Sequence, residues 1–339
     1  MPLTAEPLTL SLKTPWRIAH GASTTRTTAL VRLGDALGEG ALPPFFPWRF
    51  EAVQAYVEAL DADALLRADP LALDATLDAL PPGPPPALAA LDLALHDRWG
   101  RALGHPLYRL WGLSPERAPA STLSFSIPEH PGEIADQIAR APGFTAYKLK
   151  LGSGDVDHDA AVVQAARAAT DARLLVDANG GWTVEQAAWI IPRLGELGVV
   201  LVEQPLPAGA QEAWHTLRRR LPAEAPPLFA DESVQTAADV LALSSALGGI
   251  NVKIAKCGGI RAVRRLIVLA RALGLGVMLG CMIESSIALT AAAHLAPLAD
   301  FIDLDGTIHL ADDPFEGMRL TDAGRVTVPE RPGLGVVLR

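Results

Sequence analysis

Charged residues close a series of apolar, strand-like stretches in the later part of this 339-residue chain. Strands buried on both faces rarely carry charge, and a lone aspartate at a strand end most often caps the next helix. A charge that recurs at the same end of successive strands instead predicts one shared pocket, because parallel strands bring their carboxyl ends together. The residues concerned are Lys150, Asp177, Glu203, Asp231, Lys253, Asp303 and Asp305.

Three of these residues are carboxylates on successive stretches: Asp177, Glu203 and Asp231. Buried, unpaired carboxylates repel one another, and salt bridges to the nearby lysines would leave too many oxygens without partners. A hard cation such as Mg2+ takes oxygen ligands and keeps positions open for water and substrate. We therefore predict that Mg2+ is the cofactor and that these three residues bind it.

Lysines close the stretches on either side of the carboxylates, and Lys150 and Lys253 should face each other across them. A lysine acts as a base near neutral pH only when its pKa is lowered. Lys148 lies two residues before Lys150, on the same strand face, and supplies a like charge that would lower it. We expect all three lysines to be catalytic. Lys256 follows the strand, and we interpret it as a solvated loop charge.

Eight strand-like runs alternate with helical segments from Thr122 onward. The helix expected at 183–197 begins with a capping box, Thr183-x-x-Gln186, and that at 259–273 has one apolar face. The closing residues of successive strands are about 22 to 28 positions apart, the length of one βα unit. Eight such units favour a closed α/β barrel, and no Gly-x-Gly-x-x-Gly turn supports a dinucleotide-binding sheet. The predicted strands are 122–127, 146–150, 174–177, 199–203, 228–231, 251–253, 277–280 and 301–305.

The first third of the chain has a different pattern. Residues 7–12 and 28–33 predict strands, residues 34–40 a turn, and residues 47–104 an Ala-rich helical region interrupted by prolines at 81–86. We predict an α+β capping domain over residues 1–113, which the C-terminal segment 310–339 rejoins. The barrel would then cover residues 114–309.

Composition excludes several classes of protein. The net charge of −9 lacks the positive field that nucleic acid requires. The first 14 residues lack the pattern of a signal peptide, and no apolar run reaches the roughly 20 residues of a membrane span. Two cysteines, Cys257 and Cys281, are too few for a disulfide framework. We expect a cytoplasmic protein that binds a small molecule, and we leave open whether it forms a homo-oligomer.

The series of strand ends resembles the muconate lactonizing enzyme subgroup of the enolase superfamily. The matching motifs are Lys148-Leu-Lys150, Asp177-Ala-Asn179, Glu203-Gln-Pro, Asp231-Glu-Ser and Lys253-Ile-Ala-Lys-Cys-Gly-Gly, with Gly38-Glu39-Gly40 and residues 104–112 resembling the capping domain. The resemblance implies a modified TIM barrel, (β/α)7β, behind an N-terminal α+β cap. It also implies that the three carboxylates bind Mg2+ and that Lys150 and Lys253 are bases on opposite faces of an enolate.

Within the subgroup, Asp303-Leu-Asp305 resembles the Asp-x-Asp with which dipeptide epimerases hold the α-ammonium group of their substrate. Glu284, in Glu-Ser-Ser, also resembles these enzymes and would help to shape the substrate pocket. Ala-Glu epimerases carry an arginine where this chain has Gly21, and Arg26 is close enough to compensate. The resemblance implies an L-Ala-D/L-Glu epimerase-like enzyme. It would epimerise the α-carbon of the C-terminal residue of a dipeptide through an enediolate, by 1,1-proton transfer.

Other functions remain as alternatives. In an N-acylamino acid racemase or an o-succinylbenzoate synthase of the same subgroup, Asp303 and Asp305 would be structural, and no free amine would be required. Mandelate racemase-like enzymes place an aspartate where Lys253 stands and a histidine after the next strand. We interpret His294 and His309 as surface or helix-packing residues. A barrel that binds a ligand without catalysis would not need both lysines.

Overall fold

A three-stranded antiparallel sheet begins the part of the chain that the computed structural model describes, residues 3–339. Its strands are β1 (Leu3–Ile18), β2 (Gly21–Leu33) and β3 (Ala36–Ala41). β3 occupies most of the segment in which the sequence predicted a turn, so that prediction was wrong. The strand contains two glycines, which are rare in strands and made the segment resemble a turn. They are required because a Cβ at Gly38 or Gly40 would collide with a backbone carbonyl of α4 (Pro85–Ala102). They allow that helix to pack directly on the strand.

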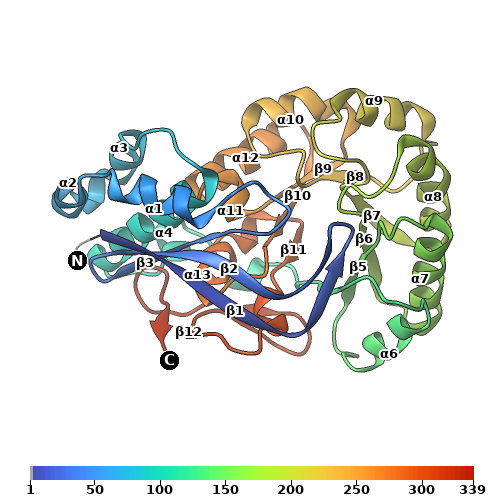
Figure 1. Cartoon of the computed structure of the whole chain (residues 1–339), viewed down its shortest axis with the longest axis horizontal. Helices are drawn as coiled ribbons and strands as arrows, with labels where there is room; N and C mark the ends of the chain where they lie inside the picture. The colour runs from blue at the N-terminus through green and yellow to red at the C-terminus, as the bar shows by residue number, and fades with distance from the viewer. Residues whose placement is uncertain (1–2) are drawn as a thin grey trace.

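The helices of the cap lie beside this sheet (Figure 1). The longest, α4, has Pro85 at its first position, where a missing N–H costs nothing. Its apolar residues pack against β2 and β3 and fill the interior between helix and sheet. The other helices are α1 (Phe50–Glu58), α2 (Ala62–Arg67), α3 (Leu73–Asp78) and α5 (Leu107–Leu110).

Eight parallel strands within residues 3–339 form the second sheet, ordered consecutively from β4 to β11. An isolated bridge between Ser121 and Ile302 joins the segment before β4 to β11 and closes the sheet into a barrel. The fold predicted from the sequence is confirmed, and for β5 and β7 the predicted bounds match. The strands are β4 (Leu123–Phe125), β5 (Ala146–Lys150), β6 (Arg173–Asp177), β7 (Val199–Glu203), β8 (Leu228–Ala230), β9 (Gly249–Val252), β10 (Gly276–Gly280) and β11 (Phe301–Asp303).

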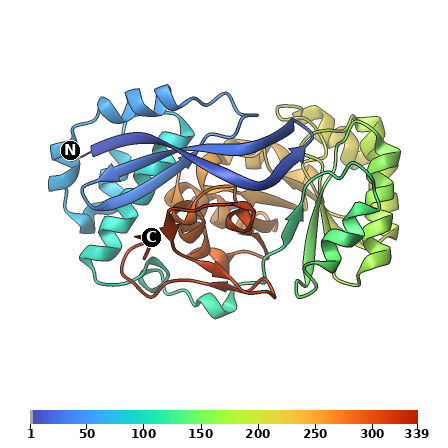
Figure 2. The same ribbon diagram turned by 60° about the horizontal axis from the view of Figure 1, so that its bottom comes forward.

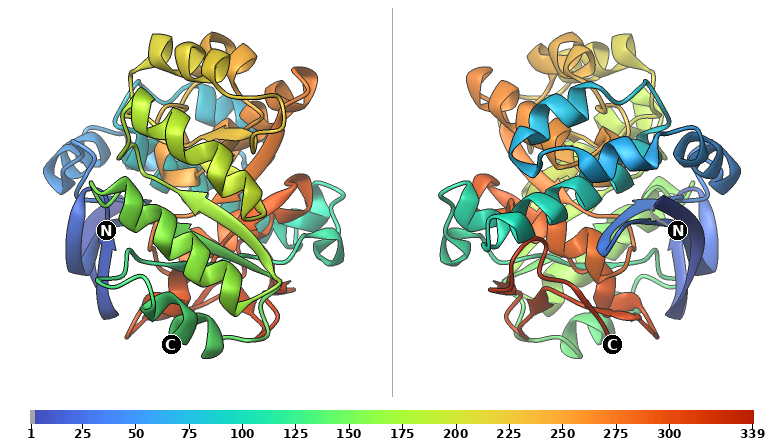
Figure 3. Two further views of the ribbon diagram at one scale, coloured as in Figure 1. Left: turned by 90° about the vertical axis from the view of Figure 1, so that its right-hand side faces the viewer. Right: turned by 90° about the vertical axis from the view of Figure 1, so that its left-hand side faces the viewer.

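Helices connect the barrel strands and stand side by side on the outer face (Figure 3). The predicted capping box at Thr183 is present and starts α8. Within the described residues no helix is long and apolar enough to cross a membrane. The helices are α6 (Glu133–Ala139), α7 (Val156–Ala169), α8 (Val184–Glu196), α9 (Gln211–Arg220), α10 (Ala237–Leu243), α11 (Ile254–Cys257), α12 (Ile260–Ala272) and α13 (Ser286–Ala293).

The segment after the last barrel strand contacts both the cap and the barrel. Leu310 forms a β-bridge with Leu12 of β1, and the N–H of Leu334 donates to Asp97 of α4 at 2.8 Å. Short strands at β12 (Phe315–Glu316), β13 (Arg319–Leu320), β14 (Val326–Thr327) and β15 (Val337–Leu338) pair within this segment.

The division into domains at residues 113 and 310 stays a prediction, and residues 1–2 of the first domain lie outside the described part.

The β1–β2 hairpin extends from the cap toward the barrel strands (Figure 2). The N–H of Ile127, just after β4, donates to the carbonyl of Arg17 near the hairpin tip at 3.0 Å. The ring of Trp16 lies 4.3 Å from that of His309, which follows β11. The hairpin therefore forms part of the wall around the barrel mouth.

Candidate active site at the barrel mouth

The three predicted metal ligands converge in the structure. Asp177 and Glu203 close β6 and β7 and are paired in the ladder, and Asp231 directly follows β8. One carboxylate oxygen from each lies within 4.8 Å of the others, and all three side chains are buried. Among the residues that the structure describes, this is the one group of its kind.

The oxygens of this group suit a divalent cation. Glu203 Oε2 and Asp231 Oδ1 are buried without a hydrogen bond from residues 3–339, and a lysine ammonium group lies 2.6 Å from the first and 3.1 Å from the second. Burial and the neighbouring Asp177 raise the pKa of Glu203 to about 8. A cation held between the three carboxylates would offset this repulsion. Because Mg2+ prefers oxygen ligands, these residues fit Mg2+.

Lys150 ends β5 and Lys253 directly follows β9, so in the order of the strands they flank the carboxylates of β6 to β8. Lys150 Nζ lies 2.6 Å from Asp177 Oδ2, and Lys253 Nζ lies 2.6 Å from Asp231 Oδ2. Burial alone would lower the pKa of Lys253, but attraction to Asp231 and Glu203 outweighs burial and raises it, the opposite of what a base requires. A divalent cation bound to these carboxylates would offset that attraction. Both lysines line a cavity at the barrel mouth.

Lys148 lies deeper in the barrel, and its side chain is fully buried. Its Nζ lies 2.6 Å from Glu203 Oε2, 2.9 Å from Asp303 Oδ2 and 3.3 Å from Asp177 Oδ2. Burial would lower the pKa of Lys148, but these three carboxylates raise it well above its usual value. The three carboxylates balance the positive charge of Lys148. That Lys148 lowers the pKa of Lys150 stays a prediction.

The pair Asp303 and Asp305 reaches the same cavity from β11. Asp303 Oδ1 accepts hydrogen bonds from the hydroxyls of Thr122 at 2.6 Å and Ser124 at 2.8 Å. Asp305 Oδ2 accepts from the backbone N–H of Ser124 at 2.6 Å and lies 3.1 Å from His309 Nε2. Their role toward a substrate stays a prediction, and the positions are compatible with it.

Arg26 and Glu284 differ in their relation to the cavity. Arg26, on β2, lines it and is 8% exposed, and within residues 3–339 its guanidinium donates to the hydroxyl of Ser23 and the carbonyl of Thr25. Burial lowers its pKa, and no carboxylate of the described residues forms an ion pair with it. Glu284 is buried outside the lining, where it accepts from the N–H of Met282 at 3.0 Å. Substrate contacts of both residues stay predictions.

The interpretation of Lys256 as a solvated charge was wrong. Its side chain is buried, and Nζ donates to the carbonyls of Asp231, Val234 and Asn251 at 2.5, 2.6 and 2.8 Å. It also lies 3.1 Å from Asp231 Oδ1. Because α11 starts directly after Lys253, one helical turn brings Lys256 back toward the barrel interior.

Sequence reasoning also missed three polar residues around the site. The amide of Gln204 accepts from the N–H of Asp231 at 3.0 Å and donates to Ser233 Oγ at 2.8 Å, so it fastens β7 to the end of β8. Asn251 donates to Glu203 Oε1 at 2.8 Å. His309 lines the cavity, contrary to our interpretation, whereas His294 is buried against Tyr108. The Glu203-Gln-Pro motif was the one available signal.

Apolar side chains from both the cap and the barrel form part of the cavity wall. Trp16 and Ile18 come from β1, Phe45 from the segment after β3, and Met282 and Ile283 from the segment after β10. Cap and barrel therefore both contribute to the enclosure. Such a site can hold a small substrate against the lysines and keep bulk water away.

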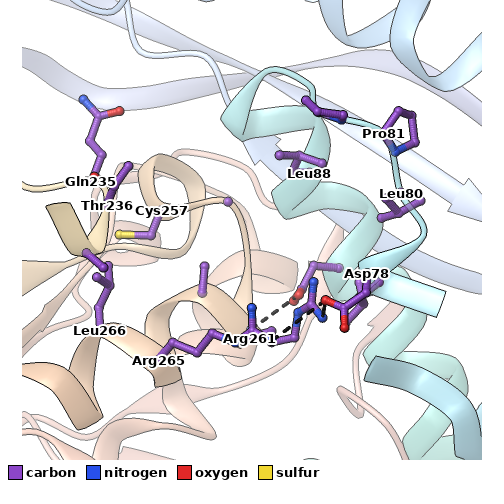
Figure 4. A pocket seen from close by; sticks show the side chains of 16 residues that line it. Asp78, Leu80, Pro81, Leu88, Gln235, Thr236, Cys257, Arg261, Arg265 and Leu266 are labelled. Atoms are coloured by element: carbon purple, nitrogen blue, oxygen red, sulfur yellow. Dashed lines mark hydrogen bonds and ion pairs between the residues drawn. The ribbon is translucent and has the colours of Figure 1, made fainter. Parts of the chain in front are cut away.

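A second cavity lies between α3, α4, α11 and α12 (Figure 4). Arg261 Nη1 lies 2.5 Å from Asp78 Oδ1, and Cys257 also faces this cavity. Asp92, on α4, accepts from the backbone N–H of Ile260 at 2.7 Å and so caps α12. These contacts join cap to barrel, and no lysine or converging carboxylates line the space.

Comparison with known proteins agrees with this geometry. The enolase C-terminal domain-like family model matches residues 133–339. An L-Ala-D/L-Glu epimerase of Bacteroides thetaiotaomicron is 36% identical, over 99% of this chain and 88% of its own. The substrate-liganded L-Ala-D/L-Glu epimerase of Bacillus subtilis is similar with a TM-score of 0.89 and 28% identity, covering 99% and 98% of the two chains. A dipeptide epimerase of Enterococcus faecalis, complexed with Mg and L-Leu-L-Tyr, has a TM-score of 0.88 and 28% identity, with coverage of 99% and 98%.

The chain therefore belongs to the enolase superfamily, in the branch whose members include the dipeptide epimerases. It is an isomerase of the racemase and epimerase type that acts on amino acid derivatives. The resemblance stated from the sequence is confirmed.

Proposed function

We propose that this enzyme epimerises dipeptides at the α-carbon of their C-terminal residue, in a reaction that depends on Mg2+. The observation that carries the proposal is the pair Lys150 and Lys253, each 2.6 Å from a different carboxylate of the converging group, at the ends of β5 and β9, which flank β6 to β8 in the sheet. An α-carbon held between two amines can lose a proton on one face and gain one on the other. Relatives named dipeptide epimerases support the choice of substrate.

The residues of this chain divide the work of the reaction. One lysine removes the α-proton to give an enediolate, and the other returns a proton from the opposite face, so that the configuration inverts. Bound at Asp177, Glu203 and Asp231, Mg2+ would supply positive charge against the negative charge that develops on the substrate carboxylate. The apolar wall at Trp16 and Phe45 limits access of water while the proton is transferred.

The test is a dipeptide library incubated with the enzyme and Mg2+ in D2O. It contains apolar and acidic second residues, because the part of the cavity wall that comes from the cap is apolar apart from Arg26. For a subset of dipeptides we expect the α-proton to be replaced by a deuteron, with the corresponding mass increase, and the second diastereomer to form. N-acetylated dipeptides serve as the comparison. If they, or N-succinyl amino acids, react as well as the free dipeptides, the enzyme is an N-acylamino acid racemase and the proposal is wrong.

A further inference from the structure

The ammonium group of Lys256 lies against four oxygen atoms of the barrel. It donates to the backbone carbonyls of Asp231 at 2.5 Å, Val234 at 2.6 Å and Asn251 at 2.8 Å. A fourth oxygen, Asp231 Oδ1, lies 3.1 Å from the same Nζ. The side chain of Lys256 is fully buried and does not line the cavity at the barrel mouth. We call these four oxygens the oxygen cage.

The three carbonyls of the oxygen cage use all the hydrogen bonds that Lys256 can donate. A lysine ammonium has three N–H groups, and each carbonyl accepts one. Asp231 Oδ1 therefore receives no hydrogen bond from residues 3–339, although the positive charge lies beside it. Asp231 Oδ2 differs, because it accepts from Lys253 Nζ at 2.6 Å. Lys256 thus offsets the charge of Asp231 and leaves Oδ1 available to a metal ion.

Lys256 also fixes the backbone from which the Asp231 carboxylate projects. The carbonyls of the oxygen cage come from the residue after β8, from Val234 in the turn that follows, and from Asn251 on β9. The N–H of Asp231 donates to the side chain of Gln204 at 3.0 Å, so both polar groups of its backbone are held by side chains. Contacts that hold a metal ligand in place typically contribute about 10- to 100-fold to metal affinity.

The oxygen cage has the chemistry of a site for a monovalent cation without its water. Backbone carbonyls replace the hydration shell of K+ in ion channels, and a free ammonium ion has the N–H groups that Lys256 uses here. The carboxylate of Asp231 supplies a negative charge beside the carbonyls. In this protein the cation is part of the chain, so the site is filled whatever the salt in solution.

We propose that Lys256 is a positioning residue. Its ammonium serves as a covalently attached monovalent cation, which holds residues 231–234 and thereby the metal ligand Asp231. It follows that the oxygen cage of a variant without this ammonium binds free NH4+. The proposal concerns the metal site alone and does not depend on the substrate of the enzyme.

The experiment titrates MnCl2, as a probe of the Mg2+ site, into substrate-free Lys256→Met by calorimetry. Methionine matches lysine in length up to the ε position, so the variant lacks little more than the ammonium. The buffer contains ammonium chloride or an equal concentration of tetramethylammonium chloride, whose cation is larger and has no N–H group. We expect Mn2+ affinity about tenfold below wild type in tetramethylammonium chloride, and within about threefold of wild type as ammonium chloride is raised.

Wild type and Lys13→Met are the controls. Lys13 also donates to a carbonyl, that of Ile308 at 2.8 Å, but at an exposed position, so its removal leaves no enclosed site. The Mn2+ affinity of both controls should be the same in the two salts.

The sign of the salt effect in Lys256→Met separates positioning from simple charge repulsion. If Lys256 acted only by repelling the metal ion, Lys256→Met would bind Mn2+ more tightly than wild type, and ammonium chloride would weaken that binding. Such a result overturns the proposal. A loss of affinity that is equal in the two salts also overturns it, because it shows a structural role that a free cation does not restore.

Thermal midpoints in the two salts show whether the variant is folded. If Lys256→Met folds in neither salt, Lys256→Ala is tested with propylammonium chloride, because propylammonium supplies the three carbons and the ammonium that alanine lacks. Propylammonium should raise both the thermal midpoint and the Mn2+ affinity of Lys256→Ala, and tetramethylammonium should raise neither. A Lys256→Ala variant that propylammonium leaves unchanged or unfolded contradicts the proposal.

Discussion

Buried carboxylates occur in two regions of this protein, and their partners differ. At the seam between cap and barrel, Glu39 accepts from the backbone N–H groups of Ser285 at 3.0 Å and Ala288 at 3.2 Å, at the start of α13. Asp92 does the same for α12, where it accepts from the backbone N–H of Ile260 at 2.7 Å. At the barrel mouth, Asp177, Glu203 and Asp231 face one another and lysine ammonium groups.

The comparison shows that burial of a carboxylate does not by itself indicate a functional site. Glu39 and Asp92 satisfy N–H groups that a helix start leaves without partners, and they lie at the positive end of the helix dipole. Those contacts stabilise the fold. The carboxylates at the barrel mouth repel one another and leave oxygens without hydrogen bonds, an arrangement that is costly unless a cation binds there.

The largest effect should follow loss of the metal site. Exhaustive treatment with EDTA, or Asp231→Asn, should reduce epimerisation by at least about a thousandfold, since most of the barrier reduction of an enzyme is electrostatic. Circular dichroism should show an unchanged fold, and added Mg2+ should restore the EDTA-treated enzyme but not the variant. Full activity in either sample would contradict the assignment of the three carboxylates.

Removal of a buried carboxylate at the seam between cap and barrel should instead lower the stability of the fold. Glu39→Ala leaves two backbone N–H groups and the Ser285 hydroxyl buried without partners, so we expect a loss of about 2–4 kcal/mol in the free energy of unfolding. Urea denaturation measures it, and Glu212→Ala, at an exposed ion pair, is the control with a change below about 0.5 kcal/mol. A Glu39→Ala variant as stable as wild type would remove the distinction between the two regions.

Glu284 provides a smaller effect that depends on pH. Burial and the neighbouring Glu39 raise the pKa of Glu284 from 4.5 to about 8. The folded state then keeps a proton that the unfolded state loses, so stability falls as pH rises from 4.5 to about 8, by at most about 1.4 kcal/mol per pH unit. Glu284→Gln should therefore gain stability relative to wild type between pH 5 and 8. If the unfolding free energies of wild type and Glu284→Gln change with pH in parallel, Glu284 does not titrate in this way.

Much of the site could be predicted because the barrel is repetitive. Apolar runs that end in a charge located β5 and β7 with their bounds, and parallel strands bring such ends together. β3 was missed because Gly38 and Gly40, which the backbone of α4 requires, are rare in strands.

The remaining features depend on contacts between distant residues. Lys148 and Asp303 are 155 positions apart, and no local pattern indicates that they pair. The buried position of Lys256 follows from a helix that begins one residue after Lys253, a boundary that sequence patterns place poorly.

The central claim is that Lys150 and Lys253 serve opposite faces of one α-carbon. The direct measurement compares Lys150→Ala and Lys253→Ala in D2O with Mg2+, using both diastereomers of a dipeptide that the wild type epimerises. We predict that neither variant epimerises, and that each still exchanges the α-proton of one diastereomer, a different one in each case. A variant that epimerises at the wild-type rate, or two variants that exchange the same diastereomer, would contradict the account.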